Sequence, residues 1–67
     1  MNNWVAVKIW AYLTEHEEAT AAEMINAAVA WSGSIYPTLY EMEEAGDITS
    51  RWEGEGYPRR KLYRRCG

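Results

Sequence analysis

The chain of 67 residues contains one cysteine, no phenylalanine and no long apolar run. Its single thiol, Cys66, excludes a disulfide within the chain and a zinc site built from cysteines. No segment approaches the roughly 20 apolar residues that span a membrane, and no signal-peptide pattern opens the chain. We therefore expect a cytoplasmic protein without membrane association, folded as a single domain over residues 1–67.

Basic residues are nearly absent from the first three quarters of the chain. Residues 1–50 contain one base, Lys8, and eight acids, whereas residues 51–67 contain six bases and two acids. The net charge of −3 argues against a polyanionic partner, but the concentration of bases at one end predicts a polyanion-binding surface. The alternative is a solvated basic tail. We favour the binding surface because the bases fall within a strand pattern.

Residues 32–46 have a clear helical pattern. Ile35, Leu39 and Met42 recur at i, i+4 and i+7, which places them on one apolar face. The opposite side is expected to carry hydroxyl groups in its first half and acids in its second half. The residues that bear these hydroxyls are Ser34, Tyr36, Thr38 and Tyr40.

Both ends of this helix have recognisable signals. Ser32 or Ser34 is expected to accept hydrogen bonds from the free N–H groups of the first turn. Pro37 is expected in or near the first turn, where its missing N–H has no intrahelical partner. Gly46 is expected to end the helix in a left-handed conformation.

Residues 3–14 are predicted to form a helix that is apolar on all sides, capped by Asn2 or Asn3. The core-facing residues are Val5, Ile9, Tyr12 and Leu13. The opposite face comprises Trp4, Val7, Trp10 and Ala11. We expect this second face to meet another protein chain. The alternative is that one or both tryptophans fold back onto the core of the same domain.

A helix-turn-helix is predicted in the middle of the chain. Thr20-Ala21-Ala22-Glu23 is a capping box that begins a helix over about residues 20–28. This helix and the next are separated by a few residues, as in a helix-turn-helix. The preceding segment, residues 14–19, is a polar linker that is expected to contribute a short strand. His16 in this linker lies among acids, but one histidine beside surface carboxylates is not expected to bind a metal.

The last part of the chain has the pattern of a β-hairpin. Residues 47–53 alternate between two faces, residues 54–58 have turn chemistry, and residues 59–64 return as a second strand. We expect Trp52 and Leu62 to form the apolar face of this hairpin. Three helices followed by a hairpin predict a mainly α, α+β fold, namely a winged helix-turn-helix with a two- or three-stranded wing.

Three stretches resemble the PadR-like winged helix-turn-helix transcriptional regulators. They are Gly33-Ser34-Ile35-Tyr36-Pro37-Thr38-Leu39-Tyr40, the segment Met42-Glu43-Glu44-Ala45-Gly46-Asp47-Ile48, and the hairpin from Trp52 to Arg64. The resemblance implies a dimeric regulator whose third helix enters the major groove of DNA while the wing lies along the backbone. It covers the DNA-binding part only, because the sequence reaches Gly67 without the C-terminal dimerisation helix usual in the family.

The expected DNA contacts lie on the third helix and on the wing. On the helix they are Ser32, Ser34, Tyr36, Pro37, Thr38 and Tyr40. On the wing they are Arg51, Arg59, Arg60, Lys61 and Arg64. The wing bases are expected to position the protein on phosphates without reading sequence. The helix lacks bases and carries Glu41, Glu43 and Glu44, so only its first two turns are expected to meet DNA. For Tyr36 and Tyr40, packing against the wing or the first helix is the alternative.

Together these patterns predict a small sequence-specific DNA-binding regulator that works as a homodimer through its first helix. No catalytic residues, metal, cofactor or small-molecule effector are expected, since no nucleophile–base pair or phosphate-binding glycine loop is present. A regulator this short is expected to be encoded by a phage or plasmid. The alternative function is a protein–protein interaction module, an adaptor or anti-repressor, that uses the acidic helices and exposed tryptophans.

Overall fold

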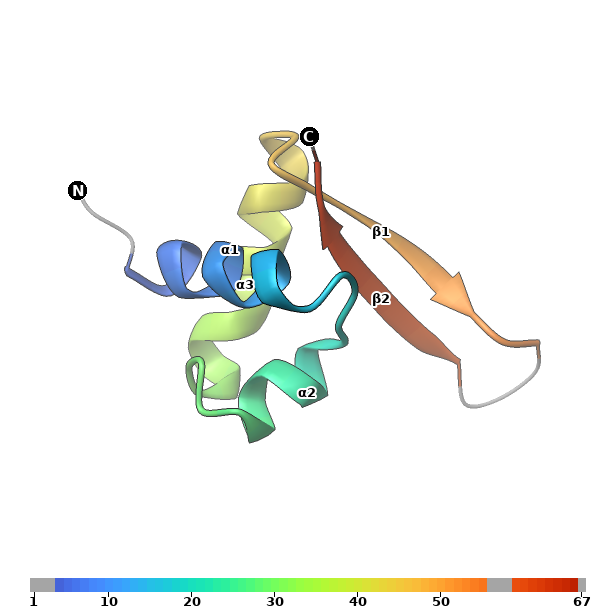
Figure 1. Cartoon of the computed structure of the whole chain (residues 1–67), viewed down its shortest axis with the longest axis horizontal. Helices are drawn as coiled ribbons and strands as arrows, with labels where there is room; N and C mark the ends of the chain where they lie inside the picture. The colour runs from blue at the N-terminus through green and yellow to red at the C-terminus, as the bar shows by residue number, and fades with distance from the viewer. Residues whose placement is uncertain (1–3, 56–58, 67) are drawn as a thin grey trace.

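The structure, a computed structural model, describes residues 4–55 and 59–66. These residues form α1 (Trp4–Glu15), α2 (Ala21–Asn26), α3 (Ser32–Glu44), β1 (Ile48–Glu53) and β2 (Arg60–Arg65). Helix α1 crosses α3, α2 lies beside them, and the hairpin of β1 and β2 projects away from the helices (Figure 1). The predicted winged helix-turn-helix is confirmed, with a wing of two strands.

A hydrophobic core joins all five elements. Its largest fully buried side chains come from α1, α2, α3 and β1, and Tyr63 of β2 is 7% exposed against them. These fully buried residues are Ile9, Leu13, Met24, Ile35, Leu39 and Ile48. Burial of one such side chain contributes about 1.5–3 kcal/mol to folding. Because α3 and the base of the hairpin share this core, their relative position is fixed by packing.

The ends of α2 follow local signals. The Thr20 Oγ1 accepts from the Glu23 N–H at 3.1 Å, and the Glu23 Oε1 accepts from the Thr20 N–H at 3.0 Å. The predicted capping box is therefore confirmed. The helix ends at Asn26, earlier than expected, because Ala28 adopts a left-handed φ of 60° that interrupts a right-handed helix.

The start of α3 differs from the prediction. Trp31 is the N-cap residue, and no side chain caps the helix, so the expectation that Ser32 or Ser34 does so is wrong. Ser32 is instead the first residue inside the helix. Pro37 lies in the second turn, where its missing N–H leaves the carbonyl of Gly33 without its usual intrahelical donor.

The end of α3 agrees with the prediction. Gly46 has a φ of 82°, and its N–H donates to the Glu43 carbonyl at 3.1 Å. The N–H of Asp47 donates to the Met42 carbonyl at 2.9 Å. This pair of bonds is the Schellman motif, which requires a left-handed residue at the position of Gly46.

The hairpin pairs in antiparallel register from Ile48 opposite Arg65 to Glu53 opposite Arg60. The linker adds one bridge, since the backbone groups of Ala19 and Tyr63 bond reciprocally at 3.0 and 2.8 Å. The linker thus contributes a single bridge in place of the short strand that was expected. The cap predicted at Asn2 or Asn3, and the turn residues 56–58, lie outside the described residues.

The register separates two residues that were expected on one face. Trp52 shares a face with Ile48 and Tyr63, which point to the core, but it extends past the core and is 55% exposed. Leu62 lies on the other face, opposite Arg51, yet is only 6% exposed. The prediction of a common apolar face is wrong because alternation places residues 52 and 62 on opposite sides in this register.

Candidate nucleic-acid interface

The exposed side of α3 carries most of the predicted helix residues. Tyr36 is 55% exposed and Tyr40 is 67% exposed, so both side chains are accessible to a ligand. Ser32 and Pro37 are exposed as well, and Ser34 is half-buried. Thr38 is buried at 6% exposure, which corrects its predicted placement on the polar side. It follows Ile35 by three residues and precedes Met42 by four, so helical geometry places it on the buried face.

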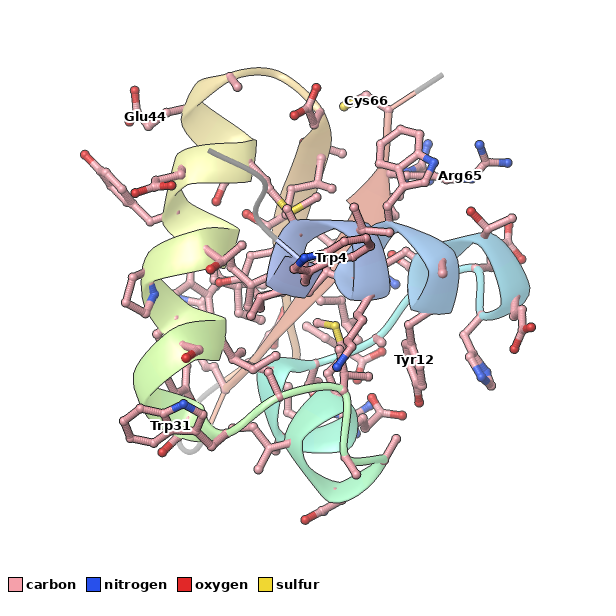
Figure 2. All side chains as sticks on the ribbon, turned by 90° about the vertical axis from the view of Figure 1, so that its left-hand side faces the viewer. Trp4, Tyr12, Trp31, Glu44, Arg65 and Cys66 are labelled. Carbon is pink, nitrogen blue, oxygen red and sulfur yellow. The ribbon has the colours of Figure 1, made fainter. Side chains whose placement is uncertain are left out.

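Charge is absent from the α2–α3 turn and the first half of α3. Residues 24–40 contain no Asp, Glu, Lys or Arg. The acids begin at Glu41, and Figure 2 shows Glu44 at the opposite end of α3 from Trp31. A polyanion that approaches the start of α3 therefore avoids the acids at its far end.

A groove connects the start of α3 to the outer part of the hairpin. Its volume is about 480 Å³, and it lies between α2, α3 and the two strands. The lining residues are Thr20, Ala21, Ala22, Tyr36, Trp52, Arg59, Arg60, Lys61 and Tyr63. The fold thus brings a predicted helix contact together with three of the predicted wing bases.

The three basic side chains that line the groove differ in their contacts with neighbouring residues. The Arg60 Nε donates to the Glu53 Oε1 at 3.0 Å, and this bond raises the pKa of the Arg60 guanidinium. The Lys61 Nζ lies 3.6 Å from the Glu43 Oε1. Arg59 has no ion pair within the described residues, and its guanidinium lies 5.4 Å from the centroid of a Trp52 ring.

Glu43 also fixes the hairpin to α3. Its Oε2 accepts from the Ser50 Oγ at 2.6 Å, while its other oxygen faces Lys61. Lys61 in turn lies over the rings of Trp52, at 5.7 Å, and Tyr63, at 5.4 Å. The ammonium group of Lys61 is therefore surrounded by an acid and two aromatic faces.

The other two predicted wing bases lie away from this groove. Arg51 donates from Nε and Nη2 to both carboxylate oxygens of Glu18, each at 2.8 Å. This bidentate pair lowers the pKa of the Glu18 carboxyl and raises that of Arg51. Arg64 lines a different hollow, together with Arg65 and the C-terminal end of α1.

Two residues near these surfaces were not among the predicted contacts. Trp31 is 72% exposed immediately before α3. Arg65 places its guanidinium 5.7 Å from the centroid of a Trp10 ring. The position of Trp31 immediately before Ser32, Gly33 and Ser34, at the predicted start of the helix, could have indicated Trp31 as a contact. No sequence pattern indicates the contact of Arg65, because α1 and β2 meet only in the fold.

The second face of α1 is partly exposed. Trp4 is 66% exposed, Val7 is 56% exposed, and Ala11 is also exposed. Trp10 is half-buried and packs against the core, so for this tryptophan the alternative prediction holds. Ala6, Val7 and Trp10 line a hollow of about 340 Å³ with residues from the end of α3 and the following turn.

Other kinds of site find no support within residues 4–55 and 59–66. No group of three or more His, Cys, Asp or Glu side chains is placed there to hold a metal ion. His16 stacks on Tyr12, with ring centroids 4.1 Å apart. In the same residues, no helix combines the length and apolarity needed to cross a membrane.

Comparison with known proteins identifies the family. No curated protein and no solved structure matches the chain significantly. The sequence model of the transcriptional regulator PadR-like family matches residues 10–65, which includes the second half of α1 and all later elements. The fold agrees, since the helices and hairpin form the winged helix expected for this family. The chain therefore belongs to the PadR-like family of transcriptional regulators.

Proposed function

We propose that this protein is a sequence-specific regulator that binds duplex DNA with the start of α3 in the major groove and the hairpin along the phosphate backbone. The observation that carries the proposal is the groove that joins Tyr36 to Arg59, Arg60 and Lys61. An aromatic hydroxyl suited to base edges thereby lies beside cations suited to phosphates.

The charge distribution restricts how such a helix approaches DNA. The exposed carboxylates of Glu41 and Glu44 repel phosphates, whereas residues 24–40 are uncharged. The approach is therefore end-on, through the N-terminal part of α3 that precedes Glu41. The helix contacts that we propose are Ser32, Ser34, Tyr36, Pro37 and Tyr40. Thr38 is buried and supports the helix from its core side.

Hydroxyl groups discriminate weakly between bases, so specificity requires a second half-site. We propose a homodimer formed through the exposed face of α1, centred on Trp4, Val7 and Ala11. Sedimentation should detect a dimer at tens of micromolar, where an association free energy of about −6 kcal/mol becomes visible. Val7→Glu should shift the protein to monomer while circular dichroism remains unchanged. A parent protein that stays monomeric in this range would contradict the interface.

The test of the DNA proposal is selection from random duplexes at about 100 mM salt, followed by titration of selected and scrambled sites. Tyr36→Ala should weaken specific binding by about 1–3 kcal/mol and leave non-specific binding nearly unchanged, as expected for a base contact. Thr49→Ala, at an exposed position outside the groove, is the control and should bind like the parent. If selection enriches no sequence, the sequence-specific proposal is wrong.

A protein–protein interaction module is the second candidate, and the exposure of Trp4 favours it. The two functions differ in their response to Glu44→Lys. In a DNA-binding regulator this change adds favourable charge far from the groove, so it should tighten non-specific binding and leave sequence preference alone. In a protein-binding module that uses the acidic helices, the same change should abolish partner capture.

A further inference from the structure

Trp31 is an exposed aromatic residue at the entrance to α3. It is 72% exposed, more than the other large hydrophobic residues of the described chain. As the N-cap residue it has an extended backbone, with φ −81° and ψ 161°. Figure 2 shows its indole at the outer edge of the molecule, beside the first turn of α3 and far from Trp4.

The indole of Trp31 lies on Gly33. A Cβ atom at this position would overlap three carbon atoms of the Trp31 ring. Gly33 lies inside the helix and is not among the residues with positive φ, so its backbone conformation does not require glycine. Glycine is a poor helix former. Its presence in the first turn is explained by the ring that lies on it.

Gly33, on which the indole lies, shares one side of α3 with two exposed tyrosines. Tyr36 follows Gly33 by three residues and Tyr40 follows it by seven, so the three positions share one side of α3. Tyr36 and Tyr40 are both exposed, and Tyr36 lines the groove that contains Arg59. The ring of Trp31 therefore begins an uncharged aromatic row that continues into the cationic groove.

We propose that Trp31 contacts duplex DNA directly by packing its indole against apolar groups of the duplex, and that Gly33 is a positioning residue for that ring. The inference rests on the function proposed above. Duplex DNA offers two such groups, the C5-methyl of thymine in the major groove and the faces of the deoxyribose rings. A flat, rigid indole supplies a large contact area at low cost in conformational entropy.

The experiment is a double-mutant cycle in DNA affinity. Trp31→Ala should raise the Kd for the selected duplex about tenfold, which corresponds to about 1.4 kcal/mol. Trp31→Phe should recover part of this loss, because it retains an aromatic ring. Gly33→Ala should also raise the Kd by displacing the indole. In the Trp31→Ala background, Gly33→Ala should cause no further loss, since the ring that its methyl displaces is gone.

Two further measurements identify the contact and guard against an indirect effect. Replacing single thymines by deoxyuracil removes the C5-methyl. If Trp31 contacts a methyl group, one such replacement weakens DNA binding by the parent but not by Trp31→Ala. If Trp31 contacts deoxyribose, no replacement has this selective effect on the parent. The change in tryptophan emission when duplex is added should be smaller in Trp31→Phe than in the parent. Urea midpoints and circular dichroism of the variants check the fold.

The failure of this inference is distinguishable from the failure of the proposed function. If Trp31→Ala binds within twofold of the parent while Tyr36→Ala binds more weakly, Trp31 is not a contact but the DNA function stands. The same conclusion follows if emission changes equally in the parent and in Trp31→Phe. If the parent binds no duplex, both proposals are overturned, and capture of a protein partner through Trp31 takes their place.

Discussion

On the exposed side of α3, Tyr36 and Tyr40 extend from a helix whose opposite face is fully buried through Ile35 and Leu39. The outer part of the hairpin is built differently. There, side chains that extend past the core are positioned by ion pairs, such as the one between Arg60 and Glu53. The proposed DNA contacts of α3 are therefore uncharged and positioned by packing. Those of the hairpin are charged, and most of them are positioned by exposed ion pairs.

This difference shows that formal charge overstates what the hairpin offers to a polyanion. Arg51 lies against Glu18, Arg60 against Glu53 and Lys61 against Glu43. A phosphate that binds one of these bases must exchange with a carboxylate. Exposed ion pairs contribute only about 0–1 kcal/mol, so the exchange is feasible. Contacts made by α3 require no such exchange.

The largest expected effect concerns stability and compares a leucine from each region. Leu39→Ala in α3 should lower the free energy of unfolding by about 4 kcal/mol, because the site is fully buried in the core. Leu62→Ala should cost about 2 kcal/mol, because Leu62 lies outside the core cluster on a face lined by long, adaptable side chains. Urea unfolding followed by circular dichroism measures both. Equal losses would show that the hairpin packs as tightly as the helix.

The next effect concerns the salt dependence of DNA binding. Changing Arg59, Arg60 and Lys61 to Ala should weaken binding to every duplex about equally, since phosphates are common to all sequences. The plot of log K against log salt should flatten by roughly 0.9 for each phosphate that the variant no longer neutralises. Titrations at several salt concentrations measure the slope. An unchanged slope would mean that the hairpin does not meet the backbone.

A smaller effect separates paired from unpaired acids in the hairpin. Glu53→Gln removes one negative charge and also frees Arg60, whereas Glu55→Gln removes a charge that forms no ion pair with a described residue. Glu53→Gln should therefore tighten non-specific DNA binding about two- to threefold more than Glu55→Gln does. A difference of this size agrees with the small contribution of exposed ion pairs. Equal effects of the two changes would indicate that pairing does not restrain Arg60.

The smallest effect is the pH dependence of the pair between Arg51 and Glu18. The bond to Arg51 lowers the pKa of Glu18 below its ordinary value of 4.5, so the folded protein holds this proton less tightly than the unfolded chain. The stability contributed by the pair is thus present above about pH 4.5 and is lost as the pH falls below it. The difference in urea midpoint between the parent and Glu18→Gln should shrink between about pH 6 and 3. A constant difference would contradict this assignment.

Much of the fold could be predicted from sequence because its signals are local. The reciprocal bonds of Thr20 and Glu23, and the left-handed Gly46, depend on residues within a few positions of each other. Strand alternation likewise predicted the hairpin within one residue of its observed strands. The absence of a cap from Ser32 shows the limit of such signals, since a competent residue one position inside a helix does not cap it.

The candidate site was less predictable because it depends on contacts between distant segments. The sequence by itself determined the helices, the turn and the supply of bases at the end of the chain, since periodicity and charge are properties of neighbours. Only the tertiary structure decided that Trp10 packs on the core and that Arg51 binds an acid 33 positions away. The contact of the Trp31 indole with Gly33 is local, between residues two positions apart, but no periodicity in the sequence indicates it. Periodicity assigns residues to a face, but what that face meets depends on how the elements pack.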